Sequence, residues 1–132
     1  MISTKGRYAL RVMIELAKAN SNEYVPLKYI ADKQQISKKY LEIIVKDLVT
    51  AKLLKGASGK GGGYKLSKRP EDYSVGEILQ VTETSLSVVA CLSESAEKCP
   101  RADQCETLSM WKEYDELVKN FFFSKKLVDL IQ

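Results

Sequence analysis

The sequence predicts a mainly α-helical chain with one small β-hairpin, and three observations lead to this fold class. Segments whose apolar residues recur at helical spacing fill most of residues 1–51. A glycine-rich stretch then separates two short strand-like segments. A long amphipathic segment follows toward the end of the chain. We therefore expect a winged helix-turn-helix domain, with the hairpin as its wing, and a long additional helix for dimerisation.

Three helices are expected in the first half of the chain. Turn-forming residues at 20–22 end the first helix, and Pro26 suits the first turn of the second. Ser37 has the residue type of an N-cap for the third helix. The three helices are expected at Thr4–Ala19, from Leu27 to about Lys33, and from Ser37 to about Ala51.

The third helix is expected to have one buried face and one basic face. Its apolar stripe is formed by Leu41, Ile44, Val45 and Leu48. Two helices joined by a short connection, the second with a basic outer face, match the helix-turn-helix arrangement, in which the second helix enters the major groove. A basic face is also typical of a helix that is only solvated. The residues on this outer face are Lys38, Lys39, Glu42, Ile43 and Lys46.

Positive charge is concentrated in the first half of the chain. Residues 1–69 carry a net charge of +10 and residues 70–132 a net charge of −6. A basic segment of this kind indicates a polyanionic partner, usually double-stranded DNA. An anionic membrane is less favoured as the partner, because no basic amphipathic helix with a broad, bulky apolar face is present. No apolar stretch approaches the ~20 residues of a membrane span. The first residues contain no apolar signal core, so we expect a cytoplasmic protein.

A hairpin is expected after the third helix. Strand-like segments at 53–58 and 64–67 flank a turn at 59–63. Glycines let a backbone approach a phosphate closely, and a purely structural hairpin rarely needs so many together. Lys60 and Lys65 add positive charge. We expect this wing to contact nucleic acid, since a nucleotide phosphate loop would need a helix directly after the glycines.

Further helices are expected in the second half of the chain. Ser74 and Glu77 form a capping-box pattern that opens a helix reaching about Val81. A long helix at 106–123 and a short last helix at 127–131 follow. The expected divisions are a winged helix-turn-helix domain at 1–81, a cysteine-rich loop at 82–105, and a dimerisation helix with the short last helix at 106–132.

The long helix carries bulky apolar side chains that need a partner surface. In so small a chain a second copy is the natural partner, and a two-fold dimer presents two recognition helices to DNA. Packing onto the same subunit is the alternative. The residues expected in the dimer interface are Trp111, Tyr114, Val118, Phe121 and Phe122.

All three cysteines lie in one polar segment. Seven residues separate Cys91 from Cys99, five separate Cys99 from Cys105, and the chain contains no histidine. Free cysteines that only fill a core are usually buried, so three of them in a polar segment suggest another role. An odd number of cysteines argues against a structural disulfide. Structural zinc usually uses paired cysteines or histidines. This spacing is compatible with several roles for the cysteines. They could ligate an iron–sulfur cluster, act as redox-sensing thiols, bind another metal or be inert.

Several segments together resemble the Rrf2 family of bacterial winged helix-turn-helix transcription regulators, which has IscR-, NsrR- and CymR-like members. The resemblance covers nearly the whole chain and implies a dimer whose long helix crosses to the partner subunit. The segments that carry it are residues 1–10, 36–42, 61–66, 74–78 and 127–130.

The resemblance implies where operator DNA is bound. Residues 37–46 would read the major groove, residues 58–64 would contact the minor groove or the backbone, and the start of the first helix would lie near phosphates. The DNA-binding residues implied are Thr4, Arg7, Ser37, Lys38, Lys39, Tyr40, Glu42, Lys46, Ser58, Lys60, Gly61, Gly62 and Tyr64.

The resemblance also implies an iron–sulfur cluster on Cys91, Cys99 and Cys105, with 2Fe–2S favoured over 4Fe–4S. The first interval is longer here than in many cluster-binding members. Leu108 stands where IscR-like members have a histidine ligand, and Arg7 where NsrR-like members have an acid. The candidate fourth ligands are Glu94, Glu97, Asp103, Glu106, a small-molecule thiol or water.

The sequence therefore predicts a dimeric repressor whose affinity for operator DNA is controlled by an iron–sulfur cluster. One alternative is a cluster-free repressor whose thiols react directly, and another is a CymR-like repressor controlled by a protein partner. An enzyme is not expected, because the chain has no histidine, no convincing nucleophile–base pair and no cofactor loop in the right context.

Overall fold

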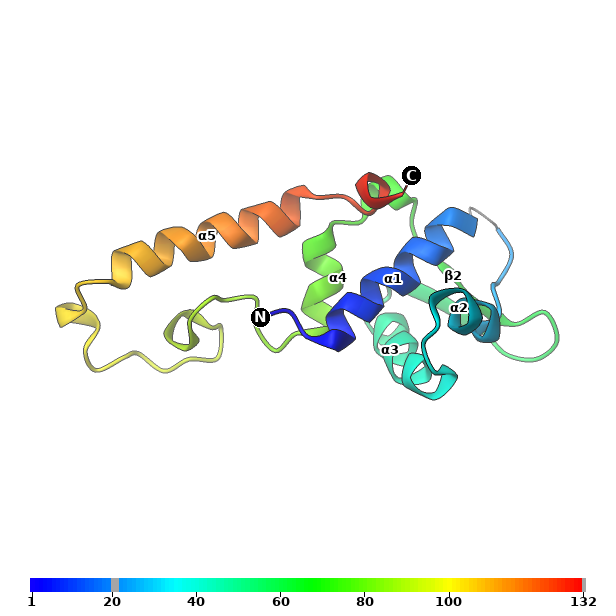
Figure 1. Ribbon diagram of the computed structural model, residues 1–132, viewed down its shortest axis with the longest axis horizontal. Coiled ribbons are helices and arrows are strands. Elements are labelled where there is room, and N and C mark those ends of the chain that lie inside the picture. The colour runs from blue at the N-terminus through cyan, green and yellow to red at the C-terminus, as the bar shows by residue number, and fades with distance from the viewer. Residues whose placement is uncertain (20–21, 132) are drawn as a thin grey trace.

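The computed structural model describes residues 1–19 and 22–131, and it confirms a mainly helical fold with a two-stranded hairpin (Figure 1). The turn expected at 20–22 falls largely on residues 20–21, which lie outside the described residues. The α-helices are α1 (Thr4–Ala19), α2 (Leu27–Gln34), α3 (Lys38–Thr50), α4 (Val75–Thr82) and α5 (Leu108–Ser124). The strands are β1 (Leu54–Ala57) and β2 (Gly63–Leu66), and the 3-10 turns are η1 (Pro70–Asp72), η2 (Ala90–Leu92), η3 (Ala102–Gln104) and η4 (Leu127–Leu130).

The hydrophobic core is built around α1, which packs against α2, α3 and α4. Val12 and Met13 of α1 are fully buried, as is Ile30 of α2. The stripe expected on α3 is confirmed, since its four residues have no exposed surface: Leu41, Ile44, Val45 and Leu48. The opposite face of α3 is therefore the one turned toward solvent.

The hairpin packs back onto the loop before α2. β1 and β2 pair antiparallel, with Leu54 opposite Leu66 and Ala57 opposite Gly63. Val25 extends this pairing by one isolated bridge to Tyr64. The wing is thus anchored to the loop before α2 through Tyr64 of β2, one residue from the turn-side pair of Ala57 and Gly63.

Tyr73 joins the hairpin to the second half of the chain. Its side chain is fully buried, and its hydroxyl donates to the Leu53 carbonyl at 2.7 Å. The same oxygen accepts hydrogen bonds from the amides of Ser67 and Lys68 at 2.9 and 3.0 Å. One hydroxyl therefore satisfies three backbone groups beside the ends of β1 and β2.

The start of α4 confirms one half of the expected capping box. Ser74 Oγ accepts a hydrogen bond from the Glu77 amide at 3.0 Å. The reciprocal half was wrong, because the Glu77 carboxylate accepts from Lys68 Nζ at 2.8 Å instead. The Val75 amide donates to the Lys125 carbonyl at 2.8 Å, which fixes the chain after α5 against the start of α4.

α5 extends away from the other helices (Figure 1). It begins at Leu108, two residues after the expected start at 106, and its end agrees with the expected one to within one residue. Asp115 is the one buried residue of this helix, all of which the structure describes. α5 therefore buries little of its surface within its own chain.

The segment at 83–107 lies along α5 and has no regular structure apart from η2 and η3. Asp115 Oδ1 accepts a hydrogen bond from the Val88 amide at 3.0 Å. Lys119 Nζ lies 2.9 Å from Asp115 Oδ2 and 3.7 Å from Glu94 Oε1. These contacts attach the first half of the segment, which contains Cys91, to the middle of α5.

Candidate functional site

The orientation of α3 is set first by its cap and by the turn before it. Ser37 Oγ accepts a hydrogen bond from the Tyr40 amide at 3.1 Å, which confirms the expected N-cap. Gln35 ends α2 in a left-handed conformation with φ of 54°, and Ile36 is buried directly after it. The connection between the two helices is therefore short and anchored in the core.

α1 braces this helix pair through polar contacts. Lys5 Nζ lies 2.6 Å from Asp47 Oδ2 on α3. Arg11 Nε donates to Gln34 Oε1 at 2.7 Å, and Gln34 Nε2 donates to Glu15 Oε1 at 2.6 Å. Since these contacts reach both α2 and α3, the exposed face of α3 is held in one orientation relative to the core.

The outer face of α3 is exposed and carries three free lysines. Lys38, Lys39 and Lys46 are exposed, and so is Glu42. Within the described part of the chain, none of these four side chains forms an ion pair. Their charges are therefore available to an external partner such as a phosphate.

The second turn of α1 contacts the N-terminal end of this face. The ring of Tyr40 packs edge-on against Tyr8 with 5.7 Å between centroids, and the Arg11 guanidinium lies 5.0 Å from the centre of the Tyr8 ring. Thr4 is one turn before Tyr8 on the same face of α1, and its hydroxyl accepts from Arg7 at 3.0 Å. Thr4 and Arg7 are exposed, so two of the predicted phosphate-contacting residues adjoin each other on the first turn of α1.

The predicted wing residues divide into exposed residues of the turn and half-buried residues that follow them. The tip residues Ser58, Lys60 and Gly61 are exposed, whereas Gly62 and Tyr64 are half-buried. Lys60 is therefore the charged side chain that the wing presents at its tip.

Glycines of the wing are required by the geometry of the hairpin itself. This corrects the expectation that a purely structural hairpin rarely needs so many glycines together. Gly63 has φ of 143°, and a side chain there would collide with the Val25 carbonyl. A side chain at Gly62 would collide with the Ala57 carbonyl. Tyr64 also anchors the wing, because its amide donates to the Val25 carbonyl at 2.9 Å. The glycine content therefore gives no independent support to phosphate binding.

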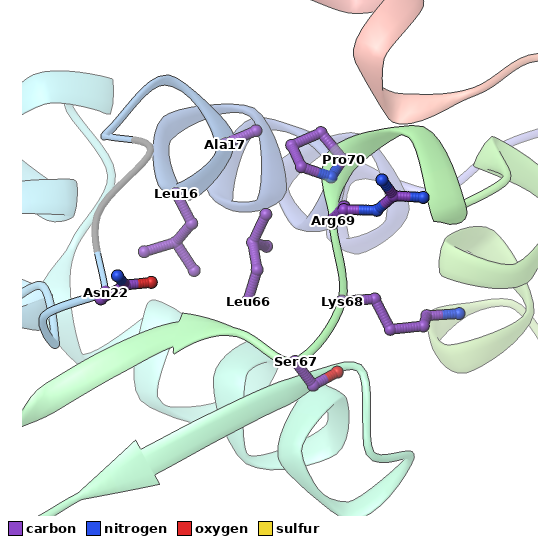
Figure 2. Close-up of a pocket in the computed structure, with 8 residues that line it drawn as sticks. All are labelled: Leu16, Ala17, Asn22, Leu66, Ser67, Lys68, Arg69 and Pro70. Carbon is purple, nitrogen blue, oxygen red and sulfur yellow. The ribbon is translucent and has the colours of Figure 1, made fainter.

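A pocket of about 310 Å³ lies between the end of α1 and the chain that follows β2 (Figure 2). Leu16 and Leu66 line it, and the side chains of Lys68 and Arg69 extend away from them (Figure 2). Lys68 pairs with Glu77, and Arg69 pairs with the two acidic residues of η1. Because both cations are neutralised within the chain, this pocket is a poor candidate for an anion site.

One face of α5 is an exposed apolar stripe with helical spacing. Its four members are 50% to 63% exposed: Met110, Tyr114, Leu117 and Phe121. Tyr114 and Phe121 were expected in a dimer interface. Met110 and Leu117 were not among the expected interface residues, although they lie four residues before and three residues after Tyr114 on the same face.

The other three expected interface residues lie on a different side of α5. Trp111, Val118 and Phe122 are half-buried and share the side on which Asp115 is buried. Phe122 packs against the small apolar cluster of Val75, Leu79 and Leu86 within the same chain. The broad stripe read from the sequence is thus two faces, of which one packs within the chain and one is free.

The structure does not bring the three cysteines together. Cys99 and Cys105 line one pocket of about 560 Å³, and Cys91 lies outside it in η2. All three are free thiols, with Cys91 and Cys105 exposed. Among the described residues, no group of three histidine, cysteine or acidic side chains is placed to hold a metal. The expected ligands are therefore present but not assembled.

The environment of Cys105 favours ionisation of its thiol. Thr107 Oγ1 lies 3.5 Å from Cys105 Sγ, and this hydrogen bond, supported by the Thr107 amide, lowers the pKa of the Cys105 thiol. A lowered pKa favours the thiolate, which is the form that binds metals and reacts as a nucleophile.

The Asp115 carboxylate, which holds the segment of Cys91 to α5, is charged in spite of its burial. Desolvation by burial raises its pKa, but hydrogen bonds from Lys119 and the Val88 amide outweigh this effect and lower the pKa overall. The hydrogen bond with Asp115 in turn raises the pKa of Lys119. The charged pair is therefore the stable form at neutral pH.

The chain contains two helices joined by a short turn, and the second helix has a basic face that is unpaired within the described residues. A hairpin with an exposed lysine at its tip follows. These features define a winged helix-turn-helix DNA-binding protein. The Rrf2 family, described as iron-dependent transcriptional regulators, matches residues 2–132. The chain therefore belongs to the Rrf2 family, as its sequence motifs predicted.

Known proteins of this family cover almost the whole chain. The HTH-type transcriptional regulator IscR of Serratia proteamaculans is 31% identical over 130 residues, which are 98% of this chain and 78% of the relative. The structure of CymR, the global cysteine regulator of B. subtilis, matches with a TM-score of 0.80 and 38% identity over 98% of this chain and 95% of its own. T. potens IscR matches with a TM-score of 0.77 and 32% identity over 98% and 85%.

The family defines the general function of the chain. It is a DNA-binding transcriptional regulator and not an enzyme, as the sequence predicted. Of the helices in the described residues, none has the length and apolar character required to cross a membrane.

Proposed function

We propose that this chain is a dimeric repressor that reads operator DNA with the outer face of α3 and is controlled by an iron–sulfur cluster held by Cys91, Cys99 and Cys105. The observation that carries the DNA interface is the set of free lysines on α3, opposite a fully buried stripe. Unpaired lysines on one helix face favour binding of a polyanion, whose phosphates supply the opposite charges.

In this interface each group of residues has a distinct role. The lysines of α3 and of the wing tip bind phosphates, and Thr4 and Arg7 add contacts beside α3. Tyr40 and Glu42 reach base edges, because they lie at the N-terminal end of the recognition helix. Three further predicted residues position these groups: Ser37 by capping α3, and Gly62 and Tyr64 by shaping the wing.

A second copy of the chain is the proposed partner of α5. The stripe of Met110, Tyr114, Leu117 and Phe121 is apolar, continuous and exposed on a helix that extends from the body of the protein (Figure 1). Exposed apolar stripes of this kind are typical of helix–helix interfaces. A two-fold axis through this stripe would present two α3 helices to one DNA duplex.

The cysteine segment suits an iron–sulfur cluster in its chemistry. It offers three free thiols, and the lowered pKa of Cys105 favours the thiolate that iron binds. A bound cluster would supply a redox-responsive centre whose iron–thiolate bonds restrain the segment. Asp115 and Lys119 would keep the first half of the segment on α5, on a different side of the helix from the stripe proposed for the dimer.

Assembly of the three ligands requires Cys91 to move. Its segment is held by the hydrogen bond from the Ser87 hydroxyl to the Leu92 carbonyl at 2.8 Å, by that from the Val88 amide to Asp115, and by an ion pair of Glu94. The ion pair between Glu94 and Lys119 spans 3.7 Å, and the Glu94 side chain is 64% exposed. Ion pairs of such exposure contribute about 0–1 kcal/mol. The segment around Cys91 contains only one short 3-10 turn, so its rearrangement breaks no helix or strand.

A cluster-free thiol sensor is the second candidate function. The observation that favours it is that Cys99 and Cys105 already line one pocket, with the pKa of Cys105 lowered. Control by a protein partner is a third candidate, supported by the likeness to CymR over almost the whole chain.

The absorbance spectrum of protein purified without oxygen, with iron and sulfide analysis of the same sample, separates the first two candidates. A cluster gives visible charge-transfer bands with stoichiometric iron and sulfide. These signals should disappear in Cys99→Ala and persist in Ser95→Ala, a matched change in the same segment. A colourless, iron-free protein that resists cluster reconstitution would contradict the cluster and favour direct thiol chemistry.

A further inference from the structure

Ile43 occupies the centre of the outer face of α3. It lies four residues after Lys39 and three before Lys46, and therefore between them on one side of the helix. Its side chain is 55% exposed, and it belongs to neither hydrophobic cluster of the described residues. Single exposed aliphatic residues are common on proteins. What distinguishes Ile43 is that it stands in the middle of the surface proposed to face the major groove.

An aliphatic side chain restricts the base that can lie against it. The edges of guanine, adenine and cytosine in the major groove present hydrogen-bond donors or acceptors, whereas thymine adds a C5 methyl group. Isoleucine can pair with no donor or acceptor, so it would desolvate a polar edge without compensation. A methyl group gains from the same contact because apolar surface is removed from water.

The neighbouring aromatic residue is less free to make this contact. The ring of Tyr40 lies one turn before Ile43, and it is packed edge-on against Tyr8. Its position is thus set partly by α1. Ile43 is the more exposed of the two, at 55% against 36%, and it is the apolar group on α3 that remains available to a base.

We propose that Ile43 is a specificity-determining residue that selects thymine in each operator half-site through the 5-methyl group. This inference rests on the proposed DNA interface and adds the base that the centre of α3 recognises. The adjacent Lys39 and Lys46 supply affinity for any duplex, because phosphate contacts carry no sequence information. The 5-methyl contact supplies discrimination at one base pair.

Uracil substitution tests the inference without altering any hydrogen-bonding group, because deoxyuridine lacks only the methyl of thymidine. The preferred site is first selected from random duplexes with the wild-type protein. Each thymine is then replaced in turn, and the dissociation constant is measured at one salt concentration. We expect that replacing one particular thymine in each half-site raises the dissociation constant about fourfold, because the contact with one buried methyl group is lost.

The same duplexes are then bound by two variants. Ile43→Ala should bind thymine and uracil sites equally, and more weakly than the wild type binds the thymine site. Val128→Ala, which removes another exposed aliphatic side chain outside α3, should retain the wild-type discrimination. If no thymine responds, or if the loss on uracil substitution persists in Ile43→Ala, the methyl contact is refuted while specific DNA binding stands. If the wild type shows no sequence preference for any duplex, the proposed interface fails and this inference fails with it.

Discussion

Replacing Leu117 by alanine examines whether the exposed stripe of α5 is buried against a second copy of the chain. Leu117 is 63% exposed, the most exposed member of the stripe. Alanine has a high helix propensity, so the substitution leaves α5 intact. It removes apolar surface that is free in the isolated chain and covered in the proposed dimer. The change should therefore weaken association without weakening the fold.

The magnitude follows from the exposed area. Complete burial of a leucine side chain contributes about 1.5–3 kcal/mol, so the exposed part lost to alanine corresponds to about 1–1.5 kcal/mol in each protomer. Both protomers carry the change, and the dimer is destabilised by about 2–3 kcal/mol, which raises its dissociation constant about 30- to 150-fold.

Sedimentation equilibrium over a dilution series measures this dissociation constant. Lys112→Ala is the matched control, because Lys112 is an exposed residue on the opposite side of α5 from the stripe. It should dissociate like the wild type. The reasoning is refuted if Leu117→Ala and the wild type dissociate at the same concentration, or if the wild type is a monomer throughout the series.

Three further predictions concern DNA binding, stability and pH. Lys46→Ala should weaken binding to every duplex and reduce the slope of log affinity against log salt by about one for each bound protomer, whereas Lys112→Ala should leave the slope unchanged. Tyr73→Phe leaves three backbone groups without their partner and should lower the free energy of unfolding in urea by about 2–4 kcal/mol, with Tyr29→Phe near neutral. The pKa of Asp115 is lowered in the folded chain, so its stabilisation is present above the ordinary carboxyl pKa and is lost as pH falls through the folded-state value. Asp115→Asn should remove that part of the acid dependence of unfolding, and an unchanged pH profile would disprove the assignment.

The elements set by local patterns could be predicted from the sequence. The limits of α1, the cap at Ser37 and the buried stripe of α3 depend on residues within a few positions of one another, and all three were confirmed. The prediction of a complete capping box was wrong because the Glu77 side chain pairs with Lys68. Lys68 lies in the chain after β2, and no short motif reveals this contact. Local spacing therefore predicts elements better than it predicts their polar partners.

The functional surfaces were predictable only where one helix carries them. The basic face of α3 follows from helical spacing, and the structure leaves it exposed. The stripe on α5 was read too broadly, because spacing does not reveal which side meets Val75 and Leu79. The segment of Cys91 is attached to α5 by the hydrogen bond from the Val88 amide to Asp115, a residue 27 positions later in the chain. Long-range contacts of this kind follow from the fold and not from local sequence.

Control of DNA binding by the cysteine segment can be measured as a difference in operator affinity. The protein purified without oxygen is titrated onto one operator fragment at fixed salt, before and after removal of bound iron and sulfide. A variant with all three cysteines replaced by serine serves as the control. If the cluster and the operator are coupled, the two dissociation constants should differ by about fivefold or more, and the control should show no difference. Equal dissociation constants for the loaded and unloaded protein would contradict control by a cluster and leave a DNA-binding regulator whose signal acts elsewhere.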